Sequence, residues 1–443
     1  MFNALANIFR IPDLRKKIFF TLGLVIVYRI GAYIPTPGID SAALAQFFDN
    51  LAKAQGRTLF GIMNMFSGGA LRRLTVFALG IMPYISASII LQLLTTVVPF
   101  LEKLSKEGEA GRRKIIQYTR YGTIVLAVVQ SFFISLWLEN PAHFQGLQIV
   151  QFPGMAFRLL TVLTLTTGTA FIMWLGEQIQ EYGIGNGISL IITVGIISRL
   201  PTAIYQVNFY LRKGQMQPFT LLLMAIIMVL VIVAVILITQ GQRRIPVQYA
   251  RRIIGRRVYG GQSTYIPLRV NQAGVIPIIF AQSIILFPAT LAGLMPFRPL
   301  QALASSLTEG GALYLILYTV LIIFFSYFYT AVTFNPIDVA ENMRKYGGFV
   351  PGIRPGKPTA QYFDFILTRI TLPGAVFLAT IAVFPQLLGS WLKVPYLVAS
   401  FFGGTGLLIV VGVMLDTMRQ IESHLLMRHY EGFMKKGRIK GRR

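Results

Sequence analysis

Long apolar segments constrain the fold of this chain more than any other feature of its sequence. A helix needs roughly 20 apolar residues to cross the about 30 Å of hydrocarbon in a bilayer. Of the segments that meet or nearly meet this length, only the first contains an Asp, Glu, Lys or Arg, which is Arg29. The pattern predicts an all-α polytopic membrane protein with ten transmembrane helices, at Ile18–Ile34, Leu74–Leu101, Tyr121–Leu138, Leu159–Gly176, Tyr182–Ser198, Gly214–Gln242, Val270–Phe297, Gly310–Ile337, Ile370–Leu392 and Val394–Leu415.

The composition excludes several other classes of protein. Apolar residues make up 54% of the 443 residues and charged residues only 13%, whereas about a quarter of a soluble domain is charged. This balance excludes a soluble globular enzyme and a disordered chain. The chain contains no cysteine, so it has no disulfide framework, no thiolate nucleophile and no cysteine metal site.

The distribution of lysine and arginine predicts the orientation in the membrane. The chain has 41 Lys and Arg against 16 Asp and Glu, a net charge of +25. With the amino terminus in the cytoplasm, 30 of these cations fall in cytoplasmic segments and nine in outer loops. Because cytoplasmic loops carry the excess of Lys and Arg, both termini are predicted to be cytosolic.

The first apolar segment is predicted to be a retained anchor rather than a signal peptide. It ends in Tyr33-Ile34-Pro35-Thr36-Pro37, which lacks a small-x-small cleavage site. Arg29 lies about five residues from the outer end of this segment, roughly 8 Å at helical rise. We expect its side chain to extend to the outer interface.

The second and seventh predicted spans share a sequence pattern. Gly80–Leu91 and Gly274–Leu286 both read GxxPxI followed by SIIL, although apolar segments also match by chance. Ten spans with both ends inside divide into two halves of five, residues 1–210 and 211–443, so a duplication would be an inverted repeat. A pair of spans interrupted by Gly and Pro at matching positions indicates the functional interface, although both residues are common in membrane helices.

The predicted spans carry none of the groups that membrane transport or catalysis usually requires. Coupled transporters bury an Asp, Glu or His, whereas Glu177, Glu181 and Asp416 lie at cytoplasmic edges and the three histidines lie outside the spans. No metal-binding or catalytic cluster is visible, and no cofactor is expected. The glycine-rich run Gly183–Gly187 lacks a Walker lysine and is predicted to be a turn that opens the fifth span.

One apolar segment is too short to cross the membrane. Thr58–Leu71 contains three glycines, Gly61, Gly68 and Gly69, and its length favours a re-entrant or interfacial piece. Irregular backbone at membrane depth requires surrounding protein or a water-filled cavity. This segment therefore indicates a cavity.

Several stretches together resemble the SecY family, the channel subunits of the bacterial protein-export translocon. The resemblance covers nearly the whole chain and departs in the amino-terminal tail, the outer loops and the last residues. The stretches that carry it are Asn64–Ala70, Phe77–Leu91, Gln117–Gly122, Trp174–Ser189, Phe349–Gly356 and Phe402–Thr405.

The resemblance implies two five-helix halves around an hourglass pore, with a short re-entrant plug helix (58–73) closing it from outside. Spans 2, 3, 7 and 8 would form a lateral gate that opens toward lipid. The positions matching the pore ring are Ile81, Ile85, Ile192, Ile279 and Ile409; those matching the lateral gate are Ser86, Gln92, Asn271 and Phe287. The plug positions are Phe60, Ile62, Met63, Asn64, Met65, Phe66, Ser67, Gly68 and Gly69.

The cytosolic segments 241–269, 338–369 and 419–443 are predicted to bind partners. Seven arginines and no acid lie between Gln242 and Val270; membrane topology can account for about half of this excess, and anionic lipid headgroups can hold the rest. The family adds two partners, the ATPase SecA and the translating ribosome, whose carboxylates and RNA phosphates suit arginine. The docking candidates are Arg243, Arg244, Arg256, Arg257 and Arg354.

The sequence therefore predicts a passive, gated channel in the bacterial cytoplasmic (inner) membrane and not an enzyme. It would export unfolded preproteins, insert membrane proteins and recognise signal peptides, with energy from SecA or the ribosome. The family implies SecE and SecG subunits alongside. The alternatives are a secondary transporter with inverted repeats, which would need buried coupling groups, and an intramembrane enzyme, which would need a catalytic pair.

Overall fold

The computed structural model describes a mostly helical chain over residues 11–55, 64, 67–144, 147–214, 216–249, 252–254, 257–259, 263–294, 311–391 and 404–436. Up to residue 214 its elements are α2 (Pro12–Gly31), α3 (Ser41–Gln55), η1 (Leu71–Arg73), α5 (Met82–Val97), α6 (Pro99–Lys106), α7 (Glu109–Glu139), η2 (Pro141–Phe144), α8 (Met155–Tyr182), α9 (Gly187–Ile197) and α10 (Leu200–Arg212). The later helices are α11 (Pro218–Gln240), α12 (Ile276–Leu294), α14 (Ala312–Thr333), α15 (Pro336–Lys345), α16 (Lys357–Trp391) and α18 (Thr405–Lys436).

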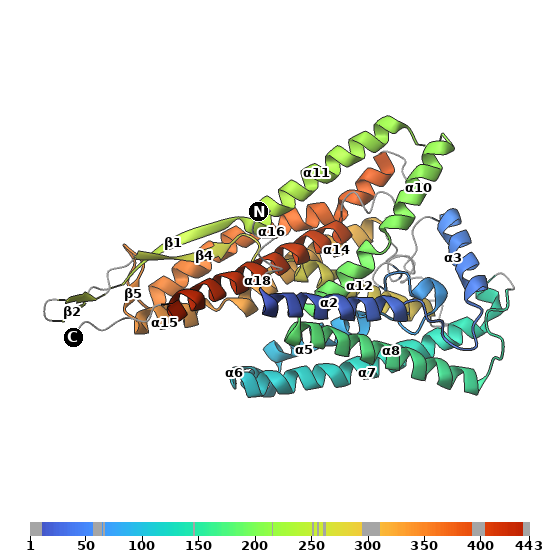
Figure 1. Cartoon of the computed structure of the whole chain (residues 1–443), viewed down its shortest axis with the longest axis horizontal. Helices are drawn as coiled ribbons and strands as arrows, with labels where there is room; N and C mark the ends of the chain where they lie inside the picture. The colour runs from blue at the N-terminus through green and yellow to red at the C-terminus, as the bar shows by residue number, and fades with distance from the viewer. Residues whose placement is uncertain are drawn as a thin grey trace.

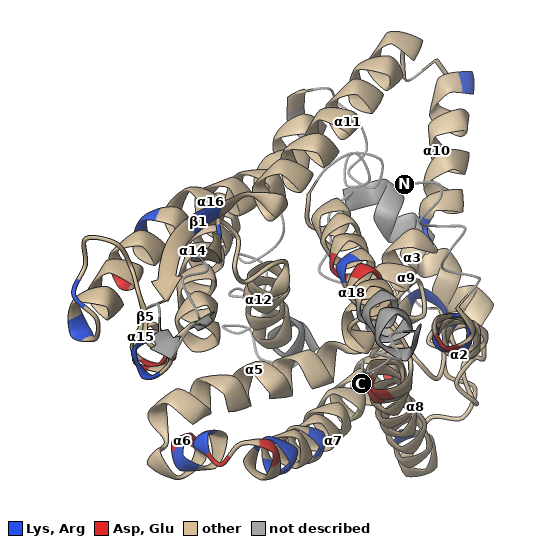
Figure 2. Ribbon diagram, turned by 60° about the vertical axis from the view of Figure 1, so that its left-hand side comes forward, with Lys and Arg blue, Asp and Glu red and all other residues tan. Residues whose placement is uncertain are grey.

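The long helices pack side by side into a bundle (Figure 1). In the first part of the chain α5 packs on α7, α7 on α8, and α8 on α2 and α9; in the second part α14 packs on α12 and α16, and α11 on α18. The two parts meet where α12 contacts α5 and α7, and where α18 contacts α9. Figure 2 shows the Lys, Arg, Asp and Glu residues mainly near the ends of the helices, with long uncharged stretches between.

Six helical segments of the described chain are long and apolar enough to cross a membrane: Glu109–Glu139, Met155–Tyr182, Gly187–Arg212, Pro218–Gln240, Ala312–Lys345 and Lys357–Gly389. A seventh span results if α5 and α6 count as one, and the apolar helix Ile276–Ala289 is shorter. The described helices thus support a polytopic membrane protein with six or seven spans.

The difference from the ten predicted spans has a local cause in several places. The second predicted span begins with irregular backbone, and its helix α5 starts only at Met82. This helix then ends in a 98° bend to α6 because Val98, which precedes Pro99, adopts an extended conformation (φ −93°, ψ 113°), as residues before proline tend to do. Residues 295–310 and 392–403, which include the end of the seventh predicted span and the beginning of the tenth, lie outside the described residues.

The basic segment 241–269 is not helical, so the all-α expectation fails outside the membrane. Strands β1 (Gln242–Tyr249) and β4 (Ser263–Arg269) pair antiparallel, β5 (Gly348–Phe349) extends the sheet at β1, and the short β2 (Arg252–Ile254) and β3 (Arg257–Tyr259) pair with each other. Alternation explains the strands, because Ile245 and Val247 are buried between exposed neighbours. They pack with Leu268 and with Phe363 of α16, so the hairpin is anchored to the end of the bundle where α15 also lies (Figure 1).

Two glycines in helices provide a test of how tightly the bundle is packed. A Cβ atom added at Gly168 of α8 would lie 1.9 Å from the carbonyl oxygen of Val76, whereas one added at Gly23 of α2 would meet nothing within 4 Å. Close approach of small residues is a common basis of helix packing in membranes. Gly168 therefore lets α8 pack against the irregular backbone that precedes α5.

We expect Gly168→Ala to destabilise the folded protein and Gly23→Ala to leave its stability nearly unchanged. Overpacking against backbone typically costs about 1–3 kcal/mol, whereas alanine at an open helix position adds helix propensity. The measurement is the temperature at which the purified protein loses its monodisperse elution profile in detergent. Equal transition temperatures for the two variants would contradict the close packing at Gly168.

Candidate functional site

The five isoleucines predicted as a pore ring lie together in one buried apolar cluster. Ile81 precedes α5 and Ile85 lies in its first turn, Ile192 lies on α9, Ile279 on α12 and Ile409 on α18. They come from both parts of the chain, yet each exposes no more than 5% of its surface. All five are therefore part of the same buried apolar core, and their role as a pore ring stays a prediction.

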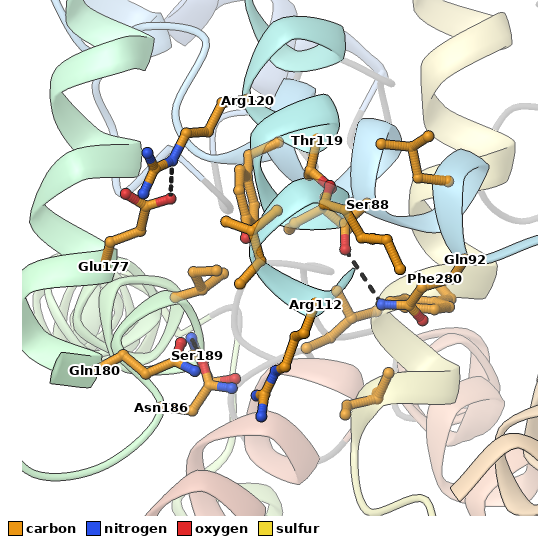
Figure 3. A pocket seen from close by; sticks show the side chains of 18 of the residues that line it. Ser88, Gln92, Arg112, Thr119, Arg120, Glu177, Gln180, Asn186, Ser189 and Phe280 are labelled. Carbon is orange, nitrogen blue, oxygen red and sulfur yellow. Dashed lines mark hydrogen bonds and ion pairs between the residues drawn. The ribbon is translucent and has the colours of Figure 1, made fainter. Parts of the chain in front are cut away.

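A cavity of about 860 Å³ lies directly beside this cluster. Ile85, Ile192 and Ile279 line it together with polar side chains of α5, α7, α8 and α9 (Figure 3). Along α5 the lining runs from Ile85 through Ser88 to Gln92, a distance of roughly 10 Å at helical rise. The isoleucine cluster thus forms part of the wall of a sizeable, mixed polar and apolar cavity.

Sequence reasoning missed Ile188, which packs against the cluster and also lines the cavity. It lies four residues before Ile192 on α9 and therefore on the same helical face. The same spacing separates Ile81 from Ile85, so this spacing was the signal that could have found it.

The cavity wall also carries charged and hydrogen-bonding groups. Arg120 of α7 and Glu177 of α8 form an ion pair with Nε 2.8 Å from Oε1, and Gln92 donates to Ser88 Oγ at 3.3 Å. Figure 3 shows these pairs around the cavity together with Arg112 and Asn186. Polar walls of this kind accept water, whereas the isoleucine cluster beside them excludes it.

The sequence pattern shared by residues 80–91 and 274–286 corresponds to a shared local structure. Gly80 and Gly274 both have positive φ, 59° and 62°, and each stands two residues before the first residue of a helix, α5 or α12. Pro83 and Pro277 follow as the second residues of these helices, where proline needs no amide partner. The two helices that form this part of the site therefore begin in the same way.

The four predicted gate residues lie at or near these two helices, which contact each other. Ser86 of α5 is buried, and its hydroxyl has no hydrogen-bond partner among the described residues. Asn271 precedes α12 and donates to the carbonyl of Gly274 at 3.0 Å. Gln92 lines the cavity, and Phe287 is a half-buried residue of α12.

Four of the nine predicted plug residues lie in the described chain. The carbonyl of Asn64 accepts from Gly69 N at 2.8 Å, its side-chain oxygen accepts from Arg72 N at 3.1 Å, and Ser67 Oγ accepts from Leu71 N at 3.2 Å. Ser67 exposes 1% of its surface. These bonds make a compact turn that is packed into the protein. Phe60, Ile62, Met63, Met65 and Phe66 lie outside the described residues.

The predicted docking arginines whose side chains are described lie at the end of the bundle that carries the β hairpin. Arg243 and Arg244 are exposed on β1. Arg354 is exposed in the loop between β5 and α16, where its carbonyl accepts from Thr359 Oγ1 at 2.8 Å and the flanking Gly352 and Gly356 have positive φ. Because β5 pairs with β1, this loop lies next to the hairpin. The side chain of Arg257 and all of Arg256 lie outside the described part.

The glycine-rich run before α9 is a turn, as predicted. Asn186 caps the helix, with its side-chain oxygen accepting from Ser189 N at 3.2 Å. Gly185 has a φ of +91°, and a Cβ atom added at Gly187 would lie 1.9 Å from the carbonyl oxygen of Gly176. Among the described residues no group of His, Cys, Asp and Glu is arranged to hold a metal ion.

The fold of the helical bundle is that of solved protein-conducting channels. A solved chain titled "The structure of a protein conducting channel" matches with a TM-score of 0.63 and 18% identity over 92% of each chain. Sec61 in the canine ribosome-channel complex from the endoplasmic reticulum matches with a TM-score of 0.60 and 17% identity, again over 92% of each chain.

Sequence comparison identifies the family. The family model described as SecY matches residues 75–418. The protein translocase subunit SecY of Escherichia coli K12 is 51% identical over 433 residues, which is 97% of this chain and 96% of that protein. The chain belongs to the SecY family, and it is a channel subunit rather than an enzyme.

We expect water to reach the cavity but not the apolar cluster beside it. The chain has no cysteine, so a cysteine introduced by mutation carries the only thiol of the protein. Ser189→Cys places it in the cavity wall, and Ser283→Cys is the matched control, since Ser283 of α12 is 1% exposed. Because thiol reactivity requires access, a water-soluble maleimide should label position 189 at least about tenfold faster than position 283. Similar labelling rates at the two positions would contradict the prediction that water reaches the cavity.

Proposed function

We propose that this chain forms the protein-conducting pore of a bacterial Sec translocase, through which unfolded preproteins leave the cytoplasm and membrane proteins enter the bilayer. The observation that carries this proposal is a buried apolar cluster from both parts of the chain that contains Ile81, Ile85, Ile192, Ile279 and Ile409. Three of these, Ile85, Ile192 and Ile279, also line a cavity with mixed polar and apolar walls. Two inverted halves, residues 1–210 and 211–443, with ten spans in total, would surround this pore.

A ring of branched aliphatic side chains suits a pore that must pass polypeptide but not ions. A narrow apolar constriction stays dry and therefore resists ion flow. Aliphatic side chains form no directional bonds, so they can move apart around a peptide of any sequence and close again behind it. The cavity beside the ring would then be the cytosolic vestibule in which the peptide enters.

A lateral exit between α5 and α12 is supported by features of these two contacting helices. The hydroxyl of Ser86 on α5 is buried without a hydrogen-bond partner among the described residues, and a buried unsatisfied group lowers stability. Both helices begin after glycines of positive φ, a conformation that favours glycine. Signal peptides and transmembrane segments would reach lipid between these helices, past Ser86, Gln92, Asn271 and Phe287.

The cytosolic partners would supply energy and bind the basic end of the molecule. Arg243, Arg244 and Arg354 are exposed at this end, and Arg256 and Arg257 belong to the same segment. Arginine binds carboxylates and RNA phosphates in bidentate fashion, which suits SecA and ribosomal RNA, and anionic lipid headgroups attract the same cations. SecE and SecG would accompany the chain in the cytoplasmic membrane, with both termini in the cytosol.

Replacing a ring isoleucine by serine should raise the ion leak of the resting channel. Ile81→Ser or Ile279→Ser places a hydroxyl in the constriction, which lowers the cost of wetting it. Ile134→Ser is the control, since Ile134 is equally buried in α7 but belongs to a different apolar cluster. The measurement is the conductance of the reconstituted complex in planar bilayers. Conductance that stays at the level of the unmodified channel in both ring variants would refute the ring.

Reversing the charge of Arg354 should abolish SecA-driven export while the complex still assembles. A carboxylate at this exposed loop tip would repel an acidic docking surface and cannot donate hydrogen bonds. Lys357→Glu is the matched control, because Lys357 is an exposed cation three residues away. Translocation of a purified preprotein into vesicles, with ATP hydrolysis by SecA recorded in parallel, provides the measurement. Normal export by Arg354→Glu would rule out this docking role.

A further inference from the structure

Arg29 is the only Asp, Glu, Lys or Arg in any of the ten apolar segments predicted to cross the membrane. Charged side chains at such depth are costly and usually serve a function. Among the described residues Arg29 has no ion-pair partner. Besides the predicted extension of its side chain toward the outer interface, its guanidinium contacts other parts of the protein.

The guanidinium contacts the plug turn, which we define as Ser67–Ala70. Arg29 Nη1 donates to the carbonyl of Gly68 at 3.3 Å. Its Nη2 lies 3.3 Å from the hydroxyl of Tyr33, and the guanidinium carbon lies 5.3 Å from the centre of the Tyr33 ring. Tyr33, which lies just beyond the end of α2, thus holds one side of the guanidinium. Its Nη1 atom reaches the plug turn.

A second side chain reaches the same carbonyl but holds it less strongly. Ser198 Oγ lies 3.4 Å from the carbonyl oxygen of Gly68 and 2.7 Å from that of Gly195. A hydroxyl has one hydrogen to donate, and the shorter distance shows that this hydrogen goes mainly to Gly195. Arg29, which is charged and donates without such competition, therefore makes the stronger bond to Gly68.

The backbone of the plug turn is shaped for this contact. Gly68 has a φ of +64°, and a Cβ atom added there would lie 3.0 Å from the Cα atom of Gly195 and 3.2 Å from Arg29 Nη1. Only glycine allows so close an approach without strain. The neighbours Ser67 and Ala70 expose 1% and 0% of their surfaces. The carbonyl of Gly68 is therefore held between α2 and the end of α9.

We propose that Arg29 is a positioning residue that holds the plug turn in the closed channel through the carbonyl of Gly68. This inference rests on the proposed function of residues 58–73 as a plug. Displacement of the plug breaks one charge-assisted hydrogen bond, while Tyr33 retains the guanidinium beside α2. The contact is then available to re-form, so the plug returns to the same place after each transported chain.

The test uses a single thiol in the plug turn of the full complex. Ser67→Cys is nearly isosteric, and the chain has no other cysteine. A membrane-impermeant maleimide added from the outer side should label this thiol severalfold faster when Arg29→Gln is also present. Arg29→Lys, which keeps the charge but has a different reach, should fall between the two. The ion leak of the resting channel should rise in the same order.

Lys213→Gln is the matched control. Lys213 is an exposed cation outside the plug segment, and its Nζ lies 4.5 Å from the centre of the Phe209 ring, so it also packs on an aromatic ring. It should leave both labelling and leak unchanged. Labelling that rises equally in Arg29→Gln and Lys213→Gln would overturn the proposal, because general loss of positive charge would then explain the effect.

Deletion of residues 60–69 separates this inference from the proposed function. If the deletion raises the resting leak but Arg29→Gln changes neither labelling nor leak, the plug assignment stands and the role of Arg29 is wrong. If the deletion leaves the leak unchanged, the plug assignment itself fails. If the deletion and Arg29→Gln both raise the leak, and Lys213→Gln does not, both are supported.

Discussion

The need to pair every backbone amide inside a bilayer determines the architecture of this chain. A spanning helix satisfies its own amides, whereas irregular backbone survives at membrane depth only when protein surrounds it. The segment before α5 meets this condition by bonding to the chain that follows α2. Thr36 N donates to the carbonyl of Leu74 at 3.0 Å and Val76 N to that of Ile34 at 2.9 Å, with α8 packed against Val76 through Gly168.

The central site forms around the starts of two helices, α5 at Met82 and α12 at Ile276. The residues around these first turns include Ile81, Ile85 and Ile279, which belong to the same buried apolar cluster as residues of α9 and α18. The cavity beside them has walls from both parts of the chain.

The sequence predicted those features that depend on periodicity and on local turn chemistry. Isoleucines spaced four apart indicated a shared helical face, and the glycine-rich run before α9 indicated a turn. In both places the local rule and the tertiary structure agree. The resemblance to the SecY family then grouped isoleucines from distant helices, which periodicity alone cannot do. The roles of these residues in transport stay predictions.

Other features depend on contacts between distant segments, and the sequence did not reveal them. The β hairpin was hidden because arginines mask the alternation of Ile245 and Val247, and its inner face is completed by Phe363, more than 100 residues later. The second predicted span carries no charged residue, yet its helix α5 starts only at Met82. The sequence likewise does not show that the carbonyl of Gly68 lies within reach of Arg29.

The central claim is that polypeptide passes between the two parts of the chain, through the isoleucine cluster. The most direct test is to stall a secretory chain in the translocase and crosslink it from a photoreactive residue at position 81 or 279, with Leu230 of α11, 62% exposed, as the outward-facing control. We predict crosslinks from both 81 and 279 and none from 230. A stalled chain that crosslinks to neither 81 nor 279 would contradict the account.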